Sequence, residues 1–325
     1  EDSLGQLQGG PQYVIREALP RAFYPLAILF SLMGLIGTLP MFQANQLTAL
    51  IRQSVDISGD SMLINLSLGI GMATIVGAVV FGGLQRVAKV AVALLPAMVI
   101  IYLGMTLYMI ISNIEQVPGI LTLIVSEAFN PQAMGGGLLG VILIGVSRGV
   151  FSNEAGLGTE VMAHGAARTN EPIREGLVAM LGPVADTLIV CTCTAIVILL
   201  AGVWQNPGEL SGVTLTANAF QAELGLLGTS LLTVVTLILS STTMFAGWYY
   251  GAKCFGFLAG AEVQHHYRWF FLATIIFGAT VSLDVVFNLI SGAYAIMAVP
   301  TMFSTFYLAG KVKAAALDYF RRHPY

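Results

Sequence analysis

Long apolar runs recur from one end of this 325-residue chain to the other. A run of about 20 apolar residues forms a helix that crosses the roughly 30 Å hydrocarbon core of a bilayer. A helix also satisfies its own backbone hydrogen bonds, as the lipid interior requires. We therefore predict an all-α, multi-pass helical membrane protein. Eight segments fit this description, the fourth being too short to span alone: 23–50, 62–81, 90–111, 137–150, 176–203, 227–251, 269–289 and 292–308.

The composition agrees with this interpretation. Hydrophobic residues make up 56% of the chain and charged residues only 10%, against about 25% charged in a typical soluble domain. A soluble protein of this size needs more charge to cover its surface. The net charge of −3 and the lack of a basic patch interleaved with aromatics argue against a nucleic-acid partner. The expected surroundings are a lipid bilayer.

Basic residues indicate the orientation, because loops rich in Lys and Arg favour the cytoplasm. When the eight segments alternate from an inside start, most of the lysines and arginines fall in cytoplasmic loops. The outside loops after Ile111 and Val203 carry Glu115, Glu209 and Glu223 but no Lys or Arg. We predict a plasma (inner) membrane location with both ends of this chain in the cytoplasm.

The stretch GVFSNEAGLG (149–158) interrupts the apolar pattern with three consecutive polar residues and two further glycines. The 14 residues of segment 137–150 reach only about 21 Å as a helix, and 159–167 would supply the missing part. One interpretation is a discontinuous helix with 152–158 unwound, a device that transporters use to place backbone groups around ions and substrates. The other is a helix that ends near Phe151, followed by an ordinary loop. Spacing alone leaves both open.

A longer string around this stretch resembles the alanine/glycine:cation symporter family, the sodium:alanine symporters. It runs RGVFSNEAGLGTEVMAHGAA (148–167) and is followed by REGLVAMLGPVADTLIVCTCTAIVIL (174–199). The family typically has Ser-Ala-Pro where this chain has Thr159, Glu160 and Val161. Shorter matches occur in the family's order, so the resemblance covers the whole chain: GGP with a following Tyr (9–13), QAN (43–45), GGLQRVAKV (82–90), GWYYG (247–251) and SLD (282–284).

The resemblance implies the inverted-repeat fold of the sodium-coupled leucine transporter, with two five-helix repeats whose first helices are broken. The segment around 137–167 becomes the first helix of the second repeat, which favours the discontinuous helix. Within a single transmembrane domain (1–325), residues 1–133 would supply the last three helices of the first repeat and 134–325 the complete second repeat. The family's other helices have no counterpart here, so we expect this chain to be part of a longer polypeptide.

The implied activity is sodium-coupled symport of alanine or glycine across the plasma membrane by alternating access. Sodium is the coupling ion, and no other cofactor is expected. The family has a pair of hydroxyl residues that serve sodium. By strict alignment this pair falls at Thr243 and Met244, and because Met244 has no hydroxyl, one sodium-binding oxygen is left unassigned. The family's pattern places substrate-binding residues at Gln43, Phe151, Ser152, Asn153 and Trp248, and sodium-binding hydroxyls at Thr242 and Thr243.

The residues themselves leave structural alternatives open at each position. Gln43 could make an interhelical hydrogen bond, as polar residues in membrane spans do. Phe151 and Trp248 could serve packing alone. The hydroxyls of Thr242 and Thr243 could bond back to carbonyls of their own helix.

Ionisable residues within the spans suggest roles and alternatives. Arg148 and Glu154 are close enough in sequence to form a structural pair. Asp186 and Asp284 match family aspartates, but two embedded aspartates could also form the dyad of an intramembrane aspartyl protease. Their contexts, VADTL and SLDVV, lack the Tyr-Asp and Gly-x-Gly-Asp settings of such enzymes, so we predict that the chain is not an enzyme.

A further alternative keeps the same fold and changes the cargo. Gly182, Asn288, Ser291 and Tyr294 stand where relatives commonly carry other residues. A cation- or proton-coupled carrier of another small solute is therefore the second hypothesis.

Overall fold

The computed structural model describes residues 8–56, 62–129, 138–167, 169–208 and 210–323. Across these ranges the regular structure is helical and no strand occurs. The first half of the chain forms α1 (Pro11–Ala18), η1 (Arg21–Phe23), α2 (Tyr24–Gly37), α3 (Met41–Ser54), α4 (Met62–Val80), α5 (Gly83–Ser112) and α6 (Val117–Ala128). The second half forms α8 (Leu138–Asn153), α9 (Thr159–His164), α10 (Pro172–Ala179), α11 (Leu181–Pro183), η2 (Val184–Cys191), α12 (Thr192–Leu200), η3 (Val203–Gln205), α13 (Val213–Ala259), η4 (Gln264–His266), α14 (Tyr267–Thr280) and α15 (Leu283–Arg322).

Several of these helices are long and apolar enough to cross a bilayer, which confirms the prediction of an all-α, multi-pass membrane protein. α6 is shorter. Within the described ranges, six candidate spans occur: Arg21–Ser54, Met62–Val80, Gln85–Ser112, Pro172–Leu200, Val213–Ala259 and Leu283–Arg322.

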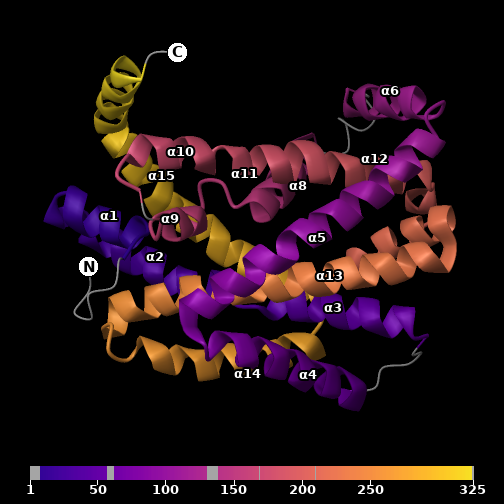
Figure 1. The fold of residues 1–325 in the computed structure, drawn as a ribbon, viewed down its shortest axis with the longest axis horizontal. Coiled ribbons are helices and arrows are strands. Elements are labelled where there is room, and N and C mark those ends of the chain that lie inside the picture. The colour runs from indigo at the N-terminus through magenta and orange to yellow at the C-terminus, as the bar shows by residue number, and fades with distance from the viewer. Residues whose placement is uncertain (1–7, 57–61, 130–137, 168, 209, 324–325) are drawn as a thin grey trace.

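The helices pack around α13, which runs along α3 and crosses α5, while α14 lies beside α4 (Figure 1). One buried cluster joins α3, α4, α13 and α14 and includes Leu47, Val76 and Phe271. A second cluster joins α5, α12 and α13 and includes Met109 and Phe220. Burial of such side chains contributes dispersion contacts and close packing. α13 contributes buried residues to both clusters, as α3 and α5 also do, so these three helices link them.

The first predicted apolar segment, 23–50, contains a kink. α2 ends at Gly37 and α3 begins at Met41. Pro40 has no amide hydrogen and its ring clashes with a preceding carbonyl, which interrupts a helix. The Thr38 amide still donates to the Gly34 carbonyl at 3.1 Å, so the last turn of α2 is closed before the chain bends at residues 38–40.

The predicted boundary between the last two segments, at 289–292, is wrong. α14 already ends at Thr280, and α15 begins at Leu283 and continues through the predicted boundary. Val281 has extended backbone with φ −97° and ψ 164°. The Asn45 side-chain amide on α3 donates to the Val281 carbonyl at 2.7 Å. A side chain of another helix thus provides a hydrogen-bond partner for a backbone carbonyl at this turn, and the apolar pattern did not reveal the turn.

Candidate functional site

The helix around residue 150 is interrupted, as predicted, but the interruption is shorter than expected. α8 ends at Asn153 and α9 begins at Thr159, so the unwound residues are 154–158 and not 152–158. Three of them adopt left-handed backbone: Glu154 with φ 55°, Gly156 with φ 79° and Gly158 with φ 94°. Glycine takes this conformation without a Cβ clash, whereas Glu154 stores about 1–3 kcal/mol of strain.

Side chains satisfy backbone groups that this break, residues 154–158, removes from the helical pattern. The Gly156 amide donates to Glu160 Oε1 at 3.2 Å. The Leu157 carbonyl accepts a hydrogen bond from the Thr301 hydroxyl of α15 at 3.1 Å. A polar group left unpaired away from water costs about 1–3 kcal/mol, so these bonds make a non-helical segment tolerable inside the protein.

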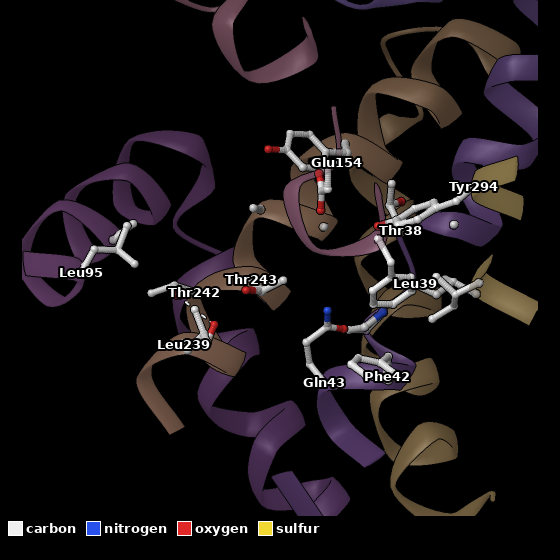
Figure 2. A pocket seen from close by; sticks show the side chains of 18 residues that line it. Thr38, Leu39, Phe42, Gln43, Leu95, Glu154, Leu239, Thr242, Thr243 and Tyr294 are labelled. Atoms are coloured by element: carbon white, nitrogen blue, oxygen red, sulfur yellow. Dashed lines mark hydrogen bonds between the residues drawn. The ribbon is translucent and has the colours of Figure 1, made fainter. Parts of the chain in front are cut away.

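A cavity of about 280 Å³ lies between this break and the kink at Pro40. Its lining comes from both interruptions, from α3 and α13, and from α5, α8 and α15. Most of the lining residues are apolar (Figure 2). Glu154 is the one charged side chain among the described residues that line it. The cavity therefore combines a small apolar space with one carboxylate.

Four of the sequence-predicted site residues line this cavity: Gln43, Phe151, Thr242 and Thr243. Gln43 lies on α3, one turn after the kink. Phe151 lies near the end of α8, where its ring packs 5.5 Å from the ring of Tyr294, another lining residue. The structure thus brings an amide, an aromatic ring and hydroxyls from different helices to one space.

The two threonines on α13 differ in how their hydroxyls are used. Thr242 donates back to the carbonyls of Ile238 and Leu239, at 3.0 Å in each case. The Thr243 hydroxyl has no hydrogen-bond partner among the described residues and borders the cavity (Figure 2). Met244, the residue that strict alignment offers as a ligand, is 1% exposed in the core. Thr243 is therefore the hydroxyl available to a ligand.

Ser152 and Asn153 bond to the π-helical segment η2 and do not line the cavity. The Ser152 hydroxyl donates to Asp186 Oδ2 at 2.8 Å, and the Asn153 amide donates to Thr187 Oγ1 at 3.0 Å. The side-chain oxygen Oδ1 of Asn153 also accepts the Ala155 amide at 2.9 Å. In this structure, both side chains fix the end of α8, and contact with a substrate stays a prediction.

Trp248 lies away from the cavity on α13. It is 8% exposed and belongs to the cluster of Leu47, Tyr249 and Phe271. Its indole Nε1 is buried without a hydrogen-bond partner among the described residues. A role for Trp248 in closing over a substrate stays a prediction, because the position it holds here is a packing position.

The expected pair between Arg148 and Glu154 is not formed in the described part of the chain, which corrects that interpretation. The Arg148 guanidinium lies 3.8 Å from the centre of the Phe287 ring instead, a favourable cation–π arrangement. Glu154 accepts a hydrogen bond from the Thr159 hydroxyl. Sequence reasoning therefore missed Glu154 as a cavity residue, although its position between Phe151 and two glycines was the available signal.

Comparison with known proteins places the chain in a family. The sequence model of the Sodium:alanine symporter family matches residues 1–324. An uncharacterized transporter of Haemophilus influenzae is 37% identical over 99% of this chain and 71% of its own length. The sodium/alanine symporter AgcS of Methanococcus maripaludis is 34% identical over 96% of this chain and 69% of its own length.

A third relative carries a different amino acid in its name. The probable sodium/glutamine symporter GlnT of Bacillus subtilis is 32% identical over 97% of this chain and 65% of its own length. The family consists of transporters and not of enzymes, which excludes the aspartyl protease hypothesis. Matched almost end to end and built from apolar helices, the chain belongs to the sodium:alanine symporter family.

Proposed function

We propose that this chain carries out sodium-coupled symport of a small neutral amino acid, alanine or glycine, and that the substrate binds in the cavity beside the break. The observation that carries the proposal is the interrupted helix itself. Glu154, the first residue of the break, lines a cavity that is also lined by Gln43, with its side-chain amide, and by Thr243, with its hydroxyl. Interrupted helices at such cavities are how many membrane transporters hold ions and substrates.

The size of the cavity favours a small solute. At about 280 Å³ it falls below the roughly 300–1,000 Å³ of pockets that hold drug-sized ligands. Its aromatic lining includes Phe151, Tyr250 and Tyr294. The Gln43 amide can donate to the substrate carboxylate. The volume suits a small amino acid, and the choice of alanine or glycine rests on the family to which the chain belongs.

The coupling cation is assigned to the hydroxyl side of the cavity. Hard cations prefer oxygen ligands, and Thr243 presents an unpartnered hydroxyl there. Thr242 can add an oxygen, because donating its proton to Ile238 and Leu239 leaves lone pairs on the hydroxyl. We assign sodium to these two residues.

The wider arrangement is proposed with the function. We place the chain in the plasma membrane with both of its ends in the cytoplasm, on the distribution of Lys and Arg. We assign residues 134–325 to the second repeat of an inverted-repeat transporter and 1–133 to part of the first. Alternating access would then expose the cavity to each side of the membrane in turn.

Uptake by the natural protein in proteoliposomes tests this function. An inward sodium gradient should drive accumulation of radiolabelled alanine or glycine, and replacing sodium with potassium should abolish it. Thr243→Ala should raise the sodium concentration needed for half-maximal uptake, while Thr280→Ala, half-buried at the end of α14 and outside the cavity lining, should leave it unchanged. Uptake that ignores sodium, or a Thr243→Ala protein with normal sodium dependence, would contradict the proposal.

A further inference from the structure

Glu154 has no positive partner in the described part of the chain. The nearest basic residue along α8, Arg148, lies on the Phe287 ring. The other carboxylates near the break do not line the cavity: Glu160 accepts the Gly156 amide through Oε1, and Asp186 accepts the Ser152 hydroxyl. An ionised carboxylate away from water needs a countercharge or several hydrogen bonds to be stable.

Only one of the two carboxylate oxygens of Glu154 has a hydrogen-bond partner among the described residues. Its Oε2 accepts a hydrogen bond from the Thr159 hydroxyl, and its Oε1 has no partner among the described residues. Figure 2 shows the carboxylate directed into the space that Gln43 and Thr243 border from the other side. The left-handed backbone of Glu154, with φ 55°, turns the side chain off the axis of α8 and toward this space.

We propose that Glu154 binds the ammonium group of the amino-acid substrate; this rests on the proposed function of the cavity. An ammonium group brings both the missing positive charge and three hydrogen-bond donors, one of which can reach Oε1. Hydrogen bonds between ionised partners are about twice as strong as neutral ones. The substrate carboxylate then points across the cavity to the Gln43 amide and toward the cation at Thr243.

The wall beside Glu154 suits an organic cation better than a metal ion. Phe151, Tyr250 and Tyr294 line the cavity on this side, and aromatic faces attract ammonium groups. A hard metal ion instead needs several oxygen ligands around it, which the Phe151 ring cannot supply. The ammonium and the carboxylate of the substrate thereby bind at opposite sides of the cavity.

This assignment makes Glu154 the residue that distinguishes an amino acid from the matching hydroxy acid. Lactate has the size and carboxylate of alanine but offers a neutral hydroxyl where alanine has its ammonium. Bound lactate would leave the carboxylate of Glu154 without a countercharge, and sites that leave a buried polar group unpaired reject the analogue strongly. The cavity should therefore take primary α-amino acids and exclude 2-hydroxy acids.

The test compares binding of alanine and lactate to the purified natural protein in saturating sodium, read by the concentration that gives half-maximal thermal stabilisation. The wild-type protein should bind alanine about a hundredfold or more tighter than lactate. E154Q should reduce this ratio at least about tenfold, mainly by weakening the binding of alanine. E154Q keeps an acceptor for Thr159, so it should fold. E154D keeps the charge and should retain the preference for alanine.

E160Q is the matched control, because it removes a carboxylate charge from α9, next to the break, while keeping an acceptor for the Gly156 amide. It should leave the preference unchanged. A folded E154Q with the wild-type alanine-to-lactate ratio, or one that loses only its response to sodium, would overturn the assignment. Loss of the preference in E154D as well as E154Q would overturn it too. Wild-type protein that transports no amino acid would instead contradict the proposed function.

Discussion

The two interruptions that border the cavity are built differently. At the kink near Pro40, residues 38–40 keep negative φ, and the Thr38 amide bonds back to Gly34 of its own helix. At the break, three of the five residues of 154–158 are left-handed, and side chains of other segments replace the lost helical bonds. A proline kink is a common, self-contained bend. Backbone strain gathers at functional sites, and here it lies at the interruption that presents the only charge in the described cavity lining.

The largest expected effect is at Gly158. A Cβ at this position would meet the ring of Pro11 and lie 2.7 Å from Thr301 Oγ1 and 2.9 Å from Phe30. The left-handed φ of 94° adds strain for any side chain. Gly158→Ala should therefore destabilise the folded protein by about 3 kcal/mol or more, seen as a lower Tm in detergent.

Gly145→Ala, on α8, is the control for this change, since apart from the backbone of its own helix nothing lies within 4 Å of a Cβ there. It should leave Tm the same or slightly higher, because alanine favours a helix. Equal Tm values for the two variants would show that the break is looser than its contacts indicate.

A smaller loss of stability is expected when one of the side chains that hydrogen-bond to the break is removed. Glu160→Ala removes the acceptor of the Gly156 amide and should destabilise the protein by about 1–3 kcal/mol. Glu160→Gln keeps an acceptor and should stay close to wild type in the same Tm measurement. If both variants melt together, the hydrogen bond to Gly156 contributes nothing to the break.

Removing a side-chain hydrogen bond at the kink should cost less stability than removing one at the break. The Thr38 hydroxyl donates to the Gly34 carbonyl at 2.7 Å, but that carbonyl also accepts the Thr38 amide. Thr38→Val therefore leaves no backbone group unpaired and should cost about 1 kcal/mol or less. A loss as large as that of Glu160→Ala would remove the distinction between the two interruptions.

The smallest effect concerns the chain beyond the break. Arg322, at the end of α15, donates to the carboxylate of Glu171 at 2.8 and 3.3 Å, and this hydrogen bonding lowers the pKa of Glu171. A lowered pKa in the folded state adds stability above the unfolded-state pKa, near 4.3, and that stability is lost as pH falls through the folded value. Acidification below about pH 4 should therefore lower the Tm of the wild-type protein slightly more than that of Arg322→Gln.

Arg321→Gln is the matched control for this pH dependence, because Arg321 makes no ion pair within the described residues. It should lose the same Tm on acidification as the wild-type protein. Identical pH profiles for Arg322→Gln and the wild type would contradict a role for the contact with Glu171.

The sequence predicted the break because Gly156 and Gly158 are residues that left-handed backbone favours. It placed the start of the break too early, since Asn153 stays helical by bonding to Thr187 of a distant segment. The turn between α14 and α15 depends on a hydrogen bond from Asn45. Such partners arise only in the folded chain, and an apolar pattern does not record them.

The candidate site divides in the same way. Gln43, Phe151 and Thr243 could be proposed from motifs, and the structure gathers them around one cavity. Glu154 was assigned to Arg148 on sequence proximity, and the left-handed backbone that separates them has no reliable sequence signal for a non-glycine residue. Trp248 shows the converse, because an aromatic in a motif packs into the core.

Protection of a cysteine placed in the cavity tests the central claim, that this space holds the substrate. Ala246 on α13 lines the cavity, and Ala246→Cys would be labelled by a small water-soluble thiol reagent in a protein whose Cys191, Cys193 and Cys254 are replaced. We predict that alanine slows this labelling at least about tenfold in sodium but not in potassium, as expected when bound substrate excludes the reagent from a small pocket, and that it leaves a cysteine at Gly145 unaffected. Labelling of Ala246→Cys at the same rate with and without alanine, in protein that takes up alanine with sodium, would contradict the account.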